Sequence, residues 1–153
     1  MKSREDIDEA KEELKRADHL IFVTLKYTRT IDVIRNTIKR LINAFDFEIL
    51  KALESAKNKK RIKLIPLLPR PRYEFLVKLM KDERIAELID FYSFLRRTDR
   101  IEGFGKDEYR KNVAMVVLDS GKRVEIDMKT LRDYFDKTKY FIELVDEWIN
   151  RLR

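Results

Sequence analysis

The spacing of apolar residues over the first third of the chain is the feature that most constrains its fold. Between Ile7 and Ile49 they recur at intervals of three or four residues, the pattern of a helix with one buried face. One uninterrupted helix from Ser3 to Lys57 would be about 80 Å long at about 1.5 Å per residue, far longer than a domain of this size. The chain must therefore turn within this region and fold back as an antiparallel pair of helices.

The sequence YTRT at residues 27–30 is the favoured position for that turn. Thr28 and Thr30 are poor helix formers that suit an N-cap, and Asp32 would then lie in a first turn, where its charge complements the helix dipole. A break at Asp18 is the competing prediction, and it would shorten the first helix. Ser3, followed by an acid three residues later, is the expected cap of that first helix.

The connector at residues 57–72 contains all three prolines, so it cannot be helical through its length. Its apolar residues are expected to hold it against the bundle: Ile62, Leu64, Ile65, Leu67 and Leu68. Pro71 and Asp82 are the expected starts of the next two helices, which could also form one kinked helix.

Residues 113–126 have a different pattern. Val113–Leu118 is rich in β-branched residues, DSGK at residues 119–122 favours a turn, and residues 123–126 alternate polar with apolar, which together predict a β-hairpin. An isolated hairpin is only marginally stable, so it must pack on the helices or pair with a second copy. Asp127 is the expected cap of the last helix, and GFGK at residues 103–106 is predicted to be a loop. The predicted fold is mainly α: one domain over residues 1–153, a helical bundle built on a long antiparallel helix hairpin, with one β-hairpin before the C-terminal helix.

Composition excludes several kinds of chemistry. The chain has no cysteine, which removes disulfides, thiolate zinc sites and cysteine nucleophiles, and His19 is its single histidine. We therefore expect no metal, no cofactor and no catalytic residue set. Acids of the last helix, Asp146 among them, alternate with lysines and are expected to be solvated.

The absence of glutamine and cysteine, together with heavy use of Lys, Glu, Arg and Ile, is typical of thermophilic proteins. The charged N-terminus and the lack of a long apolar run predict a cytoplasmic protein with no membrane partner.

Two groups of polar residues are candidate binding sites. The first is the basic sequence KNKKRIK, with Lys57, Lys59, Lys60, Arg61 and Lys63, which either contacts phosphates of RNA or is a solvated helix end. The second lies between residues 27 and 43. It is interpreted as a polar seam that bonds to a neighbouring helix, formed by Tyr27, Asp32, Asn36 and Asn43, or as a phosphate site formed by Arg29, Arg35 and Arg40.

The segments KYTRT (residues 26–30) and RLINAFDF (residues 40–47) lie in the expected helix hairpin. In these segments and in its architecture the chain resembles the HEPN class of small helical domains, and an archaeal protein family of unknown function with similar segments. The resemblance covers about the first 60 residues. It implies a dimerising bundle of the kind that acts in RNA cleavage or beside a nucleotidyltransferase. The HEPN ribonuclease motif, an arginine followed four to six residues later by histidine, is absent, so no catalytic residue is carried over.

Three functions follow as expectations. The first is a non-catalytic binding or assembly module that forms a homodimer. The second is an RNA-binding protein that contacts phosphates through the basic segment. The third is a divergent enzyme for a phosphorylated substrate, with its site around Tyr27, Arg29, Asp32 and Asn36.

Overall fold

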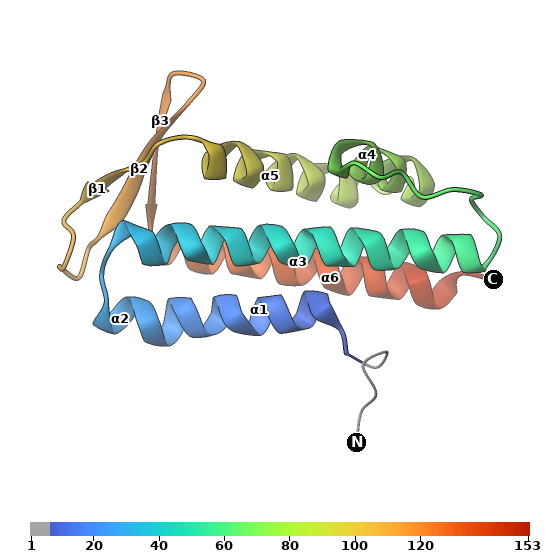
Figure 1. Cartoon of the computed structure of the whole chain (residues 1–153), viewed down its shortest axis with the longest axis horizontal. Helices are drawn as coiled ribbons and strands as arrows, with labels where there is room; N and C mark the ends of the chain where they lie inside the picture. The colour runs from blue at the N-terminus through green and yellow to red at the C-terminus, as the bar shows by residue number, and fades with distance from the viewer. Residues whose placement is uncertain (1–6) are drawn as a thin grey trace.

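Three layers of helices form the body of the molecule in the computed structural model, which describes residues 7–153 (Figure 1). The middle layer holds α3 (Ile31–Asn58) and α6 (Met128–Arg151). On one side lie α1 (Glu9–His19) and α2 (Leu25–Tyr27), and on the other lie α4 (Pro69–Met80) and α5 (Glu83–Arg100). The predicted class, mainly α with a long antiparallel helix hairpin, is confirmed.

The hairpin turns where the threonines predicted it. The first helical segment ends at Tyr27 and α3 begins at Ile31, after Thr30 in an extended conformation. The side chain of Thr30 makes no capping hydrogen bond, so the prediction of the position is right but that of a side-chain cap is not. The first helix is capped by Asp8, whose Oδ1 accepts a hydrogen bond from the backbone N–H of Lys11 at 3.3 Å. The expected cap Ser3 lies outside the described residues.

Between α1 and α2 the chain forms one wider π-helical turn, η2 (Leu20–Thr24). The buried residues on this side of the hairpin, Ala17, Ile21 and Leu25, follow one another at intervals of four. In a regular α-helix, with 3.6 residues per turn, such a series drifts around the helix axis. Because a π turn takes up extra residues, it keeps all three side chains directed at α3.

The connector between α3 and α4, residues 59–68, packs less closely than its sequence predicted. Ile62 is buried and Ile65 packs against the core, but Leu64, Leu67 and Leu68 have 77%, 87% and 66% of their surface exposed. The expectation that all five apolar residues hold the connector down is therefore wrong for these three leucines. The prolines explain this, because they fix the backbone and leave no regular periodicity that could direct each apolar side chain inward.

Helix α4 begins at Pro69, two residues before the predicted start at Pro71, and proline suits this first position because its missing N–H would have no partner there. The helix ends at Met80, and the residue after it, Lys81, has a left-handed backbone conformation with φ of 50°. Asp82 then caps α5 through a hydrogen bond from the backbone N–H of Arg84, as predicted. Two separate helices, not one kinked helix, therefore follow the connector.

The β-hairpin is present, but it belongs to a three-stranded antiparallel sheet with the order β1-β2-β3. Strands β2 (Ala114–Asp119) and β3 (Lys122–Asp127) form the predicted hairpin, and β1 (Phe104–Lys106) pairs with β2 where the sequence predicted only a loop. Gly121 has a φ of +82° in the tight turn. Buried Met115, Val117 and Ile126 face the helices, which satisfies within one chain the hairpin's need for a packing partner.

Asp127 caps α6 as predicted, accepting a hydrogen bond from the backbone N–H of Thr130 at 2.8 Å. Phe45 of α3 lies in the centre of the core, with ring centroids 4.4 Å from Phe141 of α6 and 5.0 Å from Tyr92 of α5. The same core extends to the sheet. Among the described residues, no helix has the length and apolar character needed to cross a membrane.

Candidate functional site

The predicted basic segment lies at the end of α3 and along the start of the connector. Lys57, Lys59, Lys60 and Lys63 are all exposed, and none of these lysines forms an ion pair within residues 7–153. Arg61 is different, because its guanidinium donates two hydrogen bonds, at 3.1 and 3.2 Å, to the backbone carbonyl of Arg153. Arg61 therefore holds the connector against the C-terminus, while the four lysines face solvent.

The distribution of charge along the sequence singles out this region. Residues 57–72 contain seven basic residues and no acidic one, which equals the entire net charge of +7. The other 137 residues therefore contain as many acidic as basic side chains. A basic excess concentrated in this way is common on surfaces that bind polyanions.

The second predicted phosphate site does not assemble. Arg35 points from α3 toward α5, where it donates hydrogen bonds to the carbonyl oxygens of Asp99 at 3.0 Å and Ile101 at 2.8 Å. Arg40 points toward α1, on the other side of α3. Two side chains five residues apart on a helix differ in direction by about 140°. Arg35 stabilises the C-terminal end of α5, whose last carbonyls lack helical partners. The prediction that Arg29, Arg35 and Arg40 converge on one ligand is wrong.

Arg40 and Asn43 both contact Glu13 of α1. Arg40 Nη1 lies 3.2 Å from Glu13 Oε2, and Asn43 Nδ2 lies 3.4 Å from Glu13 Oε1. Glu13 has only 6% of its surface exposed, so these contacts neutralise a carboxylate in the interface between two helices. This part of the polar stripe thus bonds α3 to α1.

The remaining residues of that stripe form no common site. Tyr27 is 86% exposed, and Asp32 and Asn36 are exposed as well. Within the described part of the chain, none of these three side chains forms a hydrogen bond or an ion pair with another side chain. Arg29 uses its backbone carbonyl to accept a hydrogen bond from Tyr109 at 2.7 Å, which ties the hairpin turn to the loop after β1. The residues expected for an enzyme site therefore make no side-chain hydrogen bond or ion pair with one another in the described structure.

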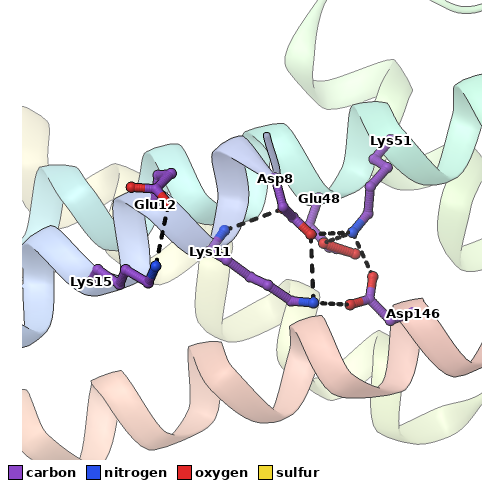
Figure 2. Close-up of polar contacts among 7 residues, drawn as sticks. All are labelled: Asp8, Lys11, Glu12, Lys15, Glu48, Lys51 and Asp146. Atoms are coloured by element: carbon purple, nitrogen blue, oxygen red, sulfur yellow. Dashed lines mark hydrogen bonds and ion pairs between the residues drawn. The ribbon is translucent and has the colours of Figure 1, made fainter. Parts of the chain in front are cut away.

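A partly buried cluster of charged residues, which was not predicted from the sequence, joins α1, α3 and α6 (Figure 2). The ammonium of Lys51 lies at its centre, 2.9 Å from Asp8 Oδ2, 2.9 Å from Glu48 Oε1 and 2.6 Å from Asp146 Oδ1. Lys11 adds a second cation, 3.4 Å from Asp146 Oδ2. The three carboxylates have the spacing of a set that could hold a metal ion, but the lysine ammonium already occupies the position between them.

Burial determines the protonation of this cluster. Glu48 is fully buried, and burial, followed by its contact with Asp146, raises the pKa of Glu48 to about 9 even though Lys51 opposes the shift. Burial alone would raise the pKa of Asp146, but its contacts with Glu48 and Lys51 lower it overall. With Glu48 protonated, Asp8 and Asp146 balance Lys11 and Lys51, so the cluster is neutral.

The expectation that Asp146 is a solvated surface residue is therefore wrong, because its side chain is only 25% exposed and lies between Lys11 of α1 and Lys51 of α3. The sequence contained a signal for the cluster at Glu48, which takes a position in the buried series Leu41, Phe45, Glu48, Ile49 and Ala52 of α3. A carboxylate in such a series must find partners in the fold. Nothing in the spacing of the sequence identifies Lys51 and Asp146 as these partners.

Two adjoining hollows form a groove between α4 and α5. At one end is a hollow of about 440 Å³ lined by Arg70, Tyr73, Ser93, Arg96, Arg97 and Arg100, with no acidic residue in its lining. It continues past Tyr73 and Ser93 into a second hollow of about 440 Å³ with the apolar residues Val77, Ala86 and Ile89 in its lining. Helix α4 begins directly after the connector (Figure 1), and Arg70, which belongs to residues 57–72, lines the first hollow.

The arginines of α5 were not among the predicted site residues. Arg96 and Arg100 are four residues apart and therefore lie on one side of α5, which is a spacing visible in the sequence. Their approach to Arg70 depends on how α4 packs against α5.

No protein-family model, curated protein or solved structure matches this chain. The resemblance to HEPN domains therefore stays a prediction.

Proposed function

We propose that this protein is a non-catalytic RNA-binding module that contacts the phosphate backbone through residues 57–72 and the adjoining arginines of α5. The concentration of the whole net charge of +7 in those sixteen residues carries the proposal. Four exposed lysines without carboxylate partners in the described structure can replace counterions along a strand. The arginine-lined hollow lies next along the same surface and offers guanidinium groups suited to phosphate.

Fluorescence anisotropy with a labelled single-stranded RNA, repeated across a salt series, tests this function. The affinity is expected to fall linearly with the logarithm of the salt concentration, because binding releases counterions. Replacing Lys59, Lys60 and Lys63 with glutamine should reduce the slope by about 2, since each phosphate contact of a single strand contributes about 0.7.

The matched control replaces Lys26, Lys39 and Lys111 with glutamine. These lysines are also exposed and without ion pairs among residues 7–153, so the control changes the net charge equally at other places on the surface. The control should keep the wild-type slope. Equal losses in the two variants would show that overall charge, and not the basic segment, determines binding, and no binding at low salt would rule the function out.

Self-association is a second candidate function, favoured by the exposed Leu64, Leu67 and Leu68 of the connector. Three large apolar side chains at one exposed site are characteristic of an interaction surface. The β-hairpin does not need a second copy to pair with, because its apolar face packs on the helices of its own chain. Light scattering should report a dimer that becomes a monomer in Leu67→Asp; a monomeric wild type at high concentration would exclude this candidate.

A further inference from the structure

The groove between α4 and α5 has two chemically different halves, and each matches a different part of a nucleotide. The arginine-lined half presents four guanidinium groups, together with the hydroxyls of Tyr73 and Ser93. The other half has an apolar wall and carries Glu74, Lys78 and Asp90. Each half has a volume of about 440 Å³, within the range of small-molecule sites.

Two of the four guanidiniums in the arginine-lined half already have carboxylate partners. Arg70 Nε donates to Glu74 at 2.9 Å, and Arg97 donates to Asp119 through two bonds of 3.2 Å. Each of these arginines keeps further N–H groups free, because a guanidinium has five. Their carboxylates hold them in position without using all of their donors.

The other two arginines have no carboxylate within ion-pair distance in the described structure. Arg96 donates to the hydroxyl of Tyr92 at 3.3 Å, and Arg100 is exposed with no side-chain partner there. Behind the hollow, the carboxylate of Asp46 accepts a hydrogen bond from Tyr92 and lies close enough to both Arg72 and Arg96 to interact electrostatically.

The charges in and directly behind the groove leave a positive excess. Six basic side chains and four carboxylates give an excess of two positive charges; they are Arg70, Arg72, Lys78, Arg96, Arg97 and Arg100 against Asp46, Glu74, Asp90 and Asp119. A terminal phosphate monoester carries between one and a half and two negative charges near pH 7. An internal phosphodiester carries only one. The hollow is therefore better matched to the end of a strand than to its middle.

The second half suits the nucleoside that follows such a phosphate. Val77, Ala86 and Ile89 provide an apolar surface for a base, and the carboxylates of Glu74 and Asp90 can accept hydrogen bonds from ribose hydroxyls. Tyr73 and Ser93 line both halves, which places the junction of phosphate and sugar beside their hydroxyls.

We propose that the α4–α5 groove binds the 5′-terminal nucleotide of RNA through its phosphate monoester. This inference rests on the proposed RNA-binding function and adds a preference for one chemical form of the strand end. The rest of the strand continues along the connector, which Arg72 fastens to the start of α4 through a hydrogen bond of 2.6 Å to the carbonyl of Pro66.

The test compares two RNAs of identical sequence, both labelled at the 3′ end, one with a 5′ monophosphate and one with a 5′ hydroxyl. Anisotropy titrations should show about tenfold tighter binding of the phosphorylated strand, since charge-assisted bonds to a terminal phosphate contribute at least this much. Arg100→Gln should weaken binding of the phosphorylated strand more than binding of the hydroxyl strand, and so bring the two affinities together. The side chain of Arg100 makes no hydrogen bond or ion pair in the described structure, so this variant is expected to keep the fold, which circular dichroism can check.

The variant with glutamine at positions 59, 60 and 63 serves as the opposite control. It should weaken both strands equally and preserve their ratio. Equal affinity of the wild-type protein for both strands, with salt-dependent binding intact, would refute the preference for the 5′ phosphate and leave the RNA-binding function standing. If neither strand binds at low salt, both proposals are refuted.

Discussion

Replacing Glu48 with glutamine tests whether the Glu48 carboxyl is protonated in the cluster around Lys51. Glutamine has nearly the shape of a protonated glutamate but does not titrate. In the wild type, burial and the contact with Asp146 raise the pKa of Glu48 from 4.5 to about 9 in the folded protein. Between these two values the folded state binds a proton that the unfolded state has released.

The sign and size of the effect follow from proton linkage. Because the folded state binds more protons, wild-type stability decreases as the pH rises through this window, by about 1.4 kcal/mol per pH unit from this one group. Glu48→Gln removes that contribution. The stability of the variant relative to wild type should therefore increase by about 2.7 kcal/mol between pH 5.5 and pH 7.5.

Urea unfolding at pH 5.5, 6.5 and 7.5 measures this stability difference. Placing an amide beside Lys51 adds at most a constant cost, and a constant cost does not alter how the difference changes with pH. Glu54→Gln on the same helix is the matched control, because Glu54 is exposed and forms no ion pair within the described residues, so its stability difference should stay constant with pH. A difference for Glu48→Gln that also stays constant would refute the reasoning. It would mean that the ion pair with Lys51, 2.9 Å away, keeps Glu48 charged.

Two further predictions concern local geometry. Arg35→Met should destabilise the protein by about 2–3 kcal/mol, because carbonyl groups at the end of α5 lose a charged donor. Thermal unfolding measures this loss, and Lys39→Met on the exposed face is the control. Equal effects of the two substitutions would contradict the capping role of Arg35. Gly121→Ala should cost about 1 kcal/mol, or about 2–4 °C in Tm, because residue 121 has a φ of +82° although no atom would lie within 4 Å of the added Cβ. An unchanged Tm would show that the turn adopts another conformation.

Local sequence signals determined the helices, most of their ends and the hairpin. The spacing of apolar residues and the maximum length of a helix together placed a turn at Thr28–Thr30, and capping residues located Asp82 and Asp127 correctly. These predictions succeeded because helix spacing, capping and turn formation depend on residues within a few positions of one another. The short strand β1 was missed because its pairing with β2 depends on residues about ten positions away.

Only the tertiary structure decided which polar residues meet. Arg35 and Arg40 are close in sequence, yet they contact helices on opposite sides of α3, and this direction depends on which helix packs on each face. Asp8, Lys51 and Asp146 form one cluster although almost the whole chain separates the first from the last. The sequence alone shows that residues 57–72 are basic. The arginine-lined groove beside them forms only because α4 and α5 pack against each other. Composition is a local property, whereas a site depends on contacts between distant segments, and these contacts are set by the packing of the whole core.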